Sequence, residues 1–283
     1  MKCHSTTPTD NNASLNTVYK KHKINGVLWS VNKNFLLAFT LMTSLLVKPS
    51  LVYATASDAG NVDNVVQNQF TIEGQYMLMT KEQFKDWLLH KQFTRNIKLI
   101  QEHHTWSPSY KDFNGSNYLP LLKWMERYHV NVMHWNNISQ NLTIFPDGEI
   151  VVCRPLDSSP QGSIGLENSA ARRAIESKSI TIENLGNFDE GNDVMTPEQK
   201  DAIVYVTALL CIKFGLTPSI NTITYHHWWD LGTGQRVLDR GQKNRVKTCP
   251  GTGFFGGNST TSAKANFYPL VLEQMKQIEV SMH

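Results

Sequence analysis

Three short segments, far apart in the chain, contain residue types that commonly bind metals. These residues are His103, His104, His226, His227 and Cys249. Two imidazoles and one thiolate leave one position of a tetrahedral Zn²⁺ open, which is the arrangement of a catalytic zinc site. A zinc ion with an open position polarises a carbonyl group and lowers the pKa of a bound water. The residue types therefore predict a zinc hydrolase, provided that the fold brings the segments together.

The alternation of side chains along a strand distinguishes the two members of one histidine pair but not those of the other. Successive side chains of a strand point to opposite faces, so His226 shares a polar face with Thr224. This favours His226 over His227 as a ligand, although both could be surface residues. The rule does not decide between His103 and His104, because both faces of the preceding strand carry apolar and polar residues.

A carboxylate lies at the end of another expected strand, Ser179–Glu183. Ile180 and Ile182 are expected to point to the core, which turns Glu183 to the opposite face. Beside a zinc-bound water, such a carboxylate can act as general base and then as general acid. A solvated carboxylate at the edge of the sheet is the alternative interpretation.

The segment around Cys249 offers a basic residue as well. Proline restricts the residue before it to extended conformations, so we expect Lys247 and Cys249 to face the same way. An ammonium group lowers the pKa of a neighbouring thiol and can stabilise an oxyanion. Two alternatives stay open: Cys249 is a catalytic nucleophile, or it is a stray thiol beside a tight turn at Pro250–Gly251.

Helical and extended patterns alternate along the chain. Thr196 and Gln199 form a capping box at the start of the helix Pro197–Phe214, which Gly215 ends. Other expected elements are helices after Thr80, at Leu119–Tyr128 and near Pro269, strands at Ile97–His103, Ser179–Glu183 and Ser219–His226, and a hairpin at Asn141–Val152. This order predicts one α/β domain, residues 71–283, with a mixed central β-sheet flanked by helices.

The first 56 residues have the order of a secretory signal. A long basic stretch precedes the apolar run Phe35–Val47, and small residues follow at Ala54 and Ala56. The run is shorter than the roughly 20 residues that a membrane-spanning helix needs, but an uncleaved N-terminal membrane anchor remains an alternative. Residues 57–70 are polar and are expected to be a linker. We therefore expect the protein to be exported to the periplasm, the cell wall or the extracellular space.

Charge and cysteine content add two expectations. The net charge of +3 is too small to indicate nucleic-acid binding. In an exported protein Cys153 and Cys211 could form a disulfide. Two buried thiols are the alternative, since Cys211 lies within an apolar helical pattern.

The ordered set of motifs resembles the type 2 N-acetylmuramoyl-L-alanine amidases, which share a fold with phage lysozyme-type amidases and animal peptidoglycan recognition proteins. The strongest stretches are residues 100–108, 144–150, 182–189 and 247–257. The resemblance implies Zn²⁺ as cofactor, peptidoglycan or a muropeptide as substrate, and cleavage of the amide between N-acetylmuramic acid and L-alanine. A peptidoglycan-binding protein that does not cut is the rival interpretation.

The resemblance also implies roles for individual residues. His103, His226 and Cys249 match the metal ligands of the family. Glu183 matches the carboxylate that activates water, and Lys247 matches the basic residue that stabilises the tetrahedral intermediate. Where many relatives carry Tyr-His, this chain has Gln140 and Asn141, which places more of the expected chemistry on Glu183.

Two further features of the resemblance are expected to be structural or peripheral. Arg154 matches an arginine that follows the hairpin, and a structural role is expected for it. The loop between His227 and Lys247 is longer than in compact relatives. Its aromatic pair, Trp228 and Trp229, could bind glycan or peptide or could pack beneath the loop.

Overall fold

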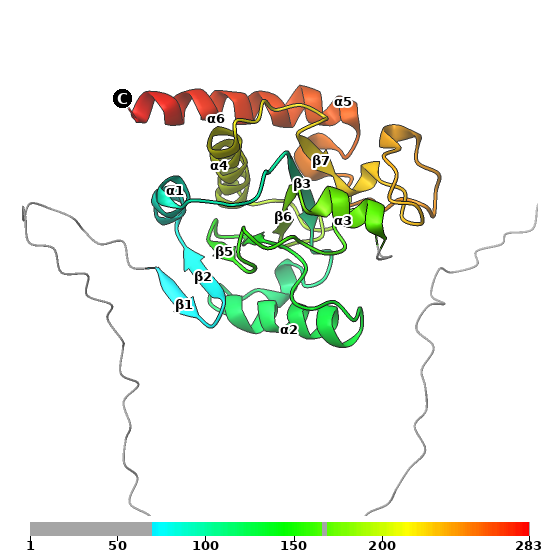
Figure 1. Ribbon diagram of the computed structural model, residues 1–283, viewed down its shortest axis with the longest axis horizontal. Coiled ribbons are helices and arrows are strands. Elements are labelled where there is room, and N and C mark those ends of the chain that lie inside the picture. Colours follow the sequence, from blue (N-terminus) through cyan, green and yellow to red (C-terminus); the bar gives the residue numbers. More distant parts are fainter. Residues whose placement is uncertain (1–69, 166–168, 283) are drawn as a thin grey trace, which may run out of the picture. The chain divides into compact units, whose positions relative to one another are not determined.

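A seven-stranded mixed sheet organises residues 70–165 and 169–282, the parts of the chain that the computed structural model describes (Figure 1). The strands are β1 (Thr71–Glu73), β2 (Tyr76–Met79), β3 (Leu99–His104), β4 (Leu142–Ile144), β5 (Ile150–Val152), β6 (Ser179–Asn184) and β7 (Ile223–Tyr225). Their order is β1-β2-β5-β4-β6-β3-β7. Strands β4, β6, β3 and β7 are parallel to one another, whereas the pairs β1–β2, β2–β5 and β5–β4 are antiparallel. The sheet is mixed, as the sequence predicts.

Helices cover both faces of this sheet. They are α1 (Lys81–His90), α2 (Tyr118–Asn131), α3 (Ala170–Glu176), α4 (Pro197–Phe214), α5 (Thr260–Ser262) and α6 (Tyr268–Ser281), with short 3₁₀ segments η1 (Tyr110–Asp112), η2 (His226–Trp228), η3 (Leu238–Arg240) and η4 (Phe254–Gly256) and a π segment η5 (Ala263–Phe267). In Figure 1, α4 and α6 lie on one side of the sheet and α2 lies on the other. None of the helices in the described ranges is long and apolar enough to cross a membrane. The expected secretory signal and all of the expected linker except Phe70 lie outside these ranges.

Helix α4 has the bounds that the sequence predicts. The Thr196 side chain accepts a hydrogen bond from Gln199 N, Pro197 occupies the first turn, and Gly215 ends the helix in the left-handed conformation (φ 63°). The expected apolar stripe is buried, with Ile203 and Val206 fully inaccessible. Because α4 packs against both α1 and α6 as well as the sheet, its apolar surface extends beyond one stripe.

Register in the sheet decides which side chains share a face. Ile100 pairs with Ile180, and both point to the large core beneath α4. Since side chains alternate, His103 and its register partner Glu183 point to the opposite face. A second, smaller core beneath α2, which includes Leu122, covers part of that face. The candidate site therefore lies on the α2 side of the sheet.

The expected strand Ser219–His226 is shorter in the structure. Ser219 O accepts hydrogen bonds from Thr222 N and Ile223 N, which closes a turn before the strand begins. The strand ends at Tyr225, and His226 opens the 3₁₀ segment η2. Local hydrogen bonding at both ends therefore overrides the extended pattern.

The hairpin β1–β2 and helix α3 were not predicted. Strand β1 has only three residues, all exposed, which is too short a run for alternation to mark a strand. Helix α3 has seven residues and two adjacent arginines, which obscure an apolar stripe. The cysteine alternatives are also resolved: Cys153 and Cys211 are buried free thiols, not a disulfide.

Candidate metal centre and active site

Three donor side chains from distant segments meet where parallel strands end. His103 belongs to β3, His226 follows the neighbouring strand β7, and Cys249 lies in a later loop. One ligand atom from each residue lies within 4.8 Å of the others, and all three residues are buried. The two imidazole Nδ1 atoms are 3.1 Å apart. Donors of one tetrahedral zinc ion lie about 3–4 Å apart, so the set fits zinc in donor type, and the spacing of the two imidazole nitrogens matches as well.

The two imidazoles are neutral, as metal binding requires. Burial lowers the pKa of His103 to about 3, with Lys247 acting in the same direction. Burial also lowers the pKa of His226 well below its usual value. The 3.8 Å contact between His103 Nδ1 and Glu183 Oε1 is therefore not an ion pair.

The thiol of Cys249 is better suited to a metal than to nucleophilic attack. Burial raises its pKa well above the usual value, although the charge of Lys247 lowers it. A reactive cysteine needs a depressed pKa, whereas a bound metal ion deprotonates a coordinating thiol. The Sγ atom also accepts a hydrogen bond from His104 N at 3.4 Å, which fixes its position.

The second histidine of each pair supports a loop. Phe188 N donates to His104 Nδ1 at 3.1 Å, so this imidazole faces the loop after β6 and not the donor cluster. The His227 Nδ1 atom lies 2.6 Å from the carbonyl oxygen of Lys247. Of the pair that strand alternation leaves open, His103 therefore lies in the donor cluster and the His104 imidazole does not.

Glu183 places a carboxylate beside the donor cluster. Its side chain is 17% exposed, and Oε2 is a buried atom without a hydrogen-bond partner. Burial raises the pKa of Glu183 to about 8, against the positive charge of Lys247, which lowers it. A partly buried carboxyl group with a shifted pKa beside a possible metal site is a candidate acid–base group.

Lys247 is exposed at the rim of the same site. Its positive charge lowers the pKa of His103, Glu183 and Cys249, so the ammonium group acts electrostatically on all three. The chain does not stay extended here, because Gly251 N donates to Thr248 O and closes a turn. The turn buries Cys249 while Lys247 remains accessible.

A buried polar network beneath β3 was missed by sequence reasoning. Asn184 Nδ2 donates to Glu102 Oε2 and to the carbonyl oxygen of His103, each at 2.9 Å. Thr207 Oγ1 of α4 donates to Glu102 Oε1 at 2.8 Å. Burial raises the pKa of Glu102 to about 7. Alternation from Ile100 places Glu102 on the core face, and a carboxylate there is the one sequence feature that could have indicated this network.

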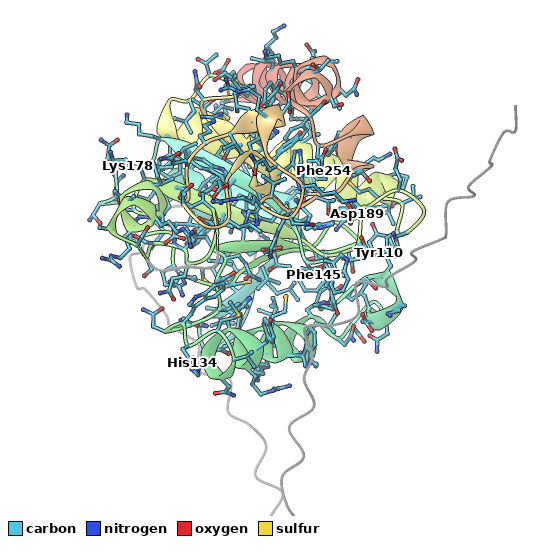
Figure 2. The ribbon with its side chains drawn as sticks, turned by 90° about the vertical axis from the view of Figure 1, so that its right-hand side faces the viewer. Tyr110, His134, Phe145, Lys178, Asp189 and Phe254 are labelled. Carbon is cyan, nitrogen blue, oxygen red and sulfur yellow. The ribbon has the colours of Figure 1, made fainter. Side chains whose placement is uncertain are left out.

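Two loops interlock next to the donor cluster. Asp189 accepts hydrogen bonds from Thr248 Oγ1 at 2.9 Å and from Thr252 N at 3.2 Å. Figure 2 shows Asp189 and Phe254 near one another, across the molecule from Lys178, which precedes β6. The loop that follows β6 therefore supports the loop that carries Cys249.

We predict that Gly251→Ala disrupts this arrangement. Gly251 has φ +118°, and a Cβ atom there would lie 2.5 Å from the backbone carbon and oxygen of Phe188. We expect the free energy of unfolding, measured with urea, to fall by about 2–4 kcal/mol. Zinc affinity should weaken as well. The control is Gly191→Ala, where φ is +84° but no atom lies within 4 Å, so the loss should be about 1 kcal/mol. Equal losses in both variants would contradict the steric argument.

Gln140 and Asn141, which stand where many relatives carry Tyr-His, have structural roles. Gln140 is fully buried and donates to Thr143 Oγ1. Asn141 donates to the carbonyl oxygens of Pro155 and Ser158. Neither side chain is accessible to a substrate.

Arg154 and the aromatic pair are also part of the packed structure. The Arg154 guanidinium donates to Ile138 O at 2.9 Å and to Ser159 O at 2.6 Å, in agreement with its expected structural role. Trp228 and Trp229 are 0% and 4% exposed, so the packing alternative holds for them.

Solved structures and a family model are similar to this chain. No curated protein matches the sequence. Among solved structures, the N-acetylmuramoyl-L-alanine amidase LysC from Clostridium intestinale URNW is 20% identical, with 56% of this chain and 80% of that chain covered and a TM-score of 0.38. Drosophila PGRP-LB is 18% identical, with 62% and 84% covered and a TM-score of 0.41. Bumblebee PGRP-SA is 17% identical, with 60% and 81% covered and a TM-score of 0.41.

A sequence model of one family matches the region that contains the whole donor cluster. The family is described as N-acetylmuramoyl-L-alanine amidase, and the match spans residues 93–252, more than half of the chain. His103, Glu183, His226, Lys247 and Cys249 all lie inside it. The chain therefore belongs to the N-acetylmuramoyl-L-alanine amidase family.

Proposed function

We propose that this protein is an exported, zinc-dependent peptidoglycan amidase. It hydrolyses the amide between N-acetylmuramic acid and the L-alanine of the stem peptide, in intact peptidoglycan or in muropeptides. The observation that carries the proposal is the convergence of His103, His226 and Cys249 within 4.8 Å, inside the region that matches the amidase family. The expected secretory signal at residues 1–56 supports export.

The protein's own residues supply binding and proton transfer. His103, His226 and Cys249 would hold the zinc ion through two neutral imidazoles and one thiolate. The bound ion would polarise the scissile carbonyl and increase the acidity of the attacking water. Glu183, whose Oε2 has no partner, accepts a proton from this water and returns it to the leaving amine. The ammonium group of Lys247 stabilises the negative charge on the carbonyl oxygen.

We expect Lys247→Ala to lower turnover about 10²- to 10³-fold, because it removes one preorganised group that stabilises the oxyanion. The zinc content should be unchanged, since Lys247 supplies no donor to the cluster. The measurement is initial rates on a purified muropeptide, with zinc determined by atomic absorption. Lys243→Ala, an exposed lysine of the same loop, is the control and should keep full activity. Near wild-type rates in Lys247→Ala would reject the assigned role.

Digestion of peptidoglycan distinguishes the proposal from its rivals. We expect mass spectrometry to detect free stem peptides and peptide-free glycans after incubation with the protein. Treatment with a chelator should abolish both products, and added zinc should restore them. A binding protein that does not cut would sediment with peptidoglycan but release nothing. An amidase that depends on a cysteine nucleophile would survive chelation and lose its activity to a thiol reagent.

A further inference from the structure

The loop between His226 and Lys247 is closed at its base by two contacts. Arg245 forms an ion pair with Asp230, at 2.7 Å from Nε and 2.6 Å from Nη2. Trp229 and Arg236 face one another in an isolated antiparallel β-bridge. The loop connects one candidate metal ligand to the segment that carries Lys247 and Cys249. Contacts at the base of the loop therefore help to hold the segment with Lys247 and Cys249 in position.

Three buried donor atoms at the bridge have no acceptor. Arg236 Nε and Nη2 and Trp229 Nε1 are inaccessible and make no hydrogen bond. Arginine and the indole N–H are donors only, so none of these atoms can satisfy another. Bridge partners have Cα atoms about 4.5–5.5 Å apart and side chains on the same side, which places the donors in one neighbourhood. Buried donors without a partner are costly and call for an acceptor.

The charge of Arg236 is also uncompensated. Its guanidinium carbon lies 5.7 Å from the ring of Trp229 and 6.0 Å from that of Trp228, which gives cation–π contacts. In the described part of the chain, no carboxylate forms an ion pair with Arg236. The nearby phenol of Tyr268 donates to Ile223 O, and burial raises its pKa, so it stays neutral. Burial lowers the pKa of Arg236 itself.

The two unpartnered Arg236 nitrogens define the missing acceptor. Nε–H and Nη2–H are the parallel pair on one edge of a guanidinium, and this edge matches the two oxygens of a carboxylate. The indole N–H of Trp229 adds a third donor in the same neighbourhood. We propose that Trp229 and Arg236 form a carboxylate-binding site at the base of the loop. Its ligand is a small carboxylate such as acetate, or the carboxylate terminus of a short peptide.

The test is the thermal unfolding of the full chain in the presence of carboxylates. Sodium acetate should raise the melting temperature saturably, by about 2–5 °C, against sodium chloride at equal ionic strength. A short peptide with a free carboxylate terminus is compared with the same peptide amidated. If both acetate and the peptide with a free carboxylate raise the melting temperature, the site also binds peptides. If only acetate raises the melting temperature, the site is confirmed and its ligands are limited to small carboxylates.

Three variants and one control separate specific binding from a general salt effect. Arg236→Gln should abolish the acetate shift, and Arg236→Lys, which keeps the charge but loses the parallel pair, should reduce it strongly. Trp229→Phe keeps an aromatic side chain and removes the N–H, so it should weaken apparent acetate affinity several-fold without unfolding the protein. Arg240→Gln, an exposed arginine of the same loop, should behave as wild type.

Two results would overturn the proposal. One is the absence of a saturable acetate effect on the wild-type chain. The other is an undiminished acetate shift of the melting temperature in Arg236→Gln. If Arg236→Gln does not fold, an undiminished shift in both Trp229→Phe and Arg236→Lys has the same meaning. Because none of these readouts measures hydrolysis, failure of the carboxylate site and failure of the proposed amidase activity are distinguishable.

Discussion

Glu183→Gln should lower amide hydrolysis about 10²- to 10⁴-fold, which is the usual contribution of a positioned acid–base group. Glutamine preserves the size of the side chain but cannot take a proton from water. The position of Glu183 opposite His103 in the β3–β6 register, with Oε2 unpartnered, is the structural reason for this expectation. Zinc content and the melting temperature should stay close to those of the wild type, because Glu183 is not one of the three donors.

The measurement is the single-turnover rate on a purified muropeptide, with zinc content determined on the same preparation. Glu190→Gln is the matched control, since Glu190 is exposed on the loop that follows β6 and should leave the rate unchanged. Full activity of Glu183→Gln would remove this residue from the mechanism. Loss of zinc in that variant would show a structural role instead.

Cys249→Ala should lose the metal and with it nearly all activity. Two imidazoles alone supply too few ligands, because a catalytic zinc site uses three protein donors. A metal contributes several kcal/mol to stabilisation of the transition state, so we expect the rate to fall about 10³-fold or more. Metal analysis after dialysis, together with the rate at added zinc, measures both effects.

Cys211→Ala is the control for removal of a buried thiol. Cys211 lies in α4, within the large core, and its replacement should cost stability but no zinc. A stoichiometric zinc content in Cys249→Ala would contradict the assignment of Cys249 as a ligand. Retained zinc with lost activity would point instead to the thiol as a nucleophile.

Much of the local structure follows from short stretches of sequence. The caps at Thr80 and Thr196 satisfy backbone donors within the first turn of their helices, so three or four neighbouring residues are enough to locate them. Alternation from Ile180 correctly turns Glu183 away from the core beneath α4. The same rule places His226 on the face of Thr224, although the strand itself ends at Tyr225.

What the sequence could not decide depends on contacts between distant segments. The orientation of His104 is set by Phe188 N, and the burial of Glu102 is stabilised by Asn184 and Thr207. Trp229 and Arg236 form a site only because the loop folds back on itself. Each of these partners lies outside the helix turn or the strand of the residue that it positions.

The sequence by itself therefore determined the residue types of the candidate metal site, the mixed α/β order of elements and the family to which the chain belongs. Only the tertiary structure decided which histidine of the first pair faces Cys249, and that Gln140 and Trp228 are buried. The physical reason is the distance along the sequence over which each interaction acts. Capping and alternation are set by neighbouring residues, whereas the convergence of donors more than a hundred residues apart is set by how the sheet and its loops pack.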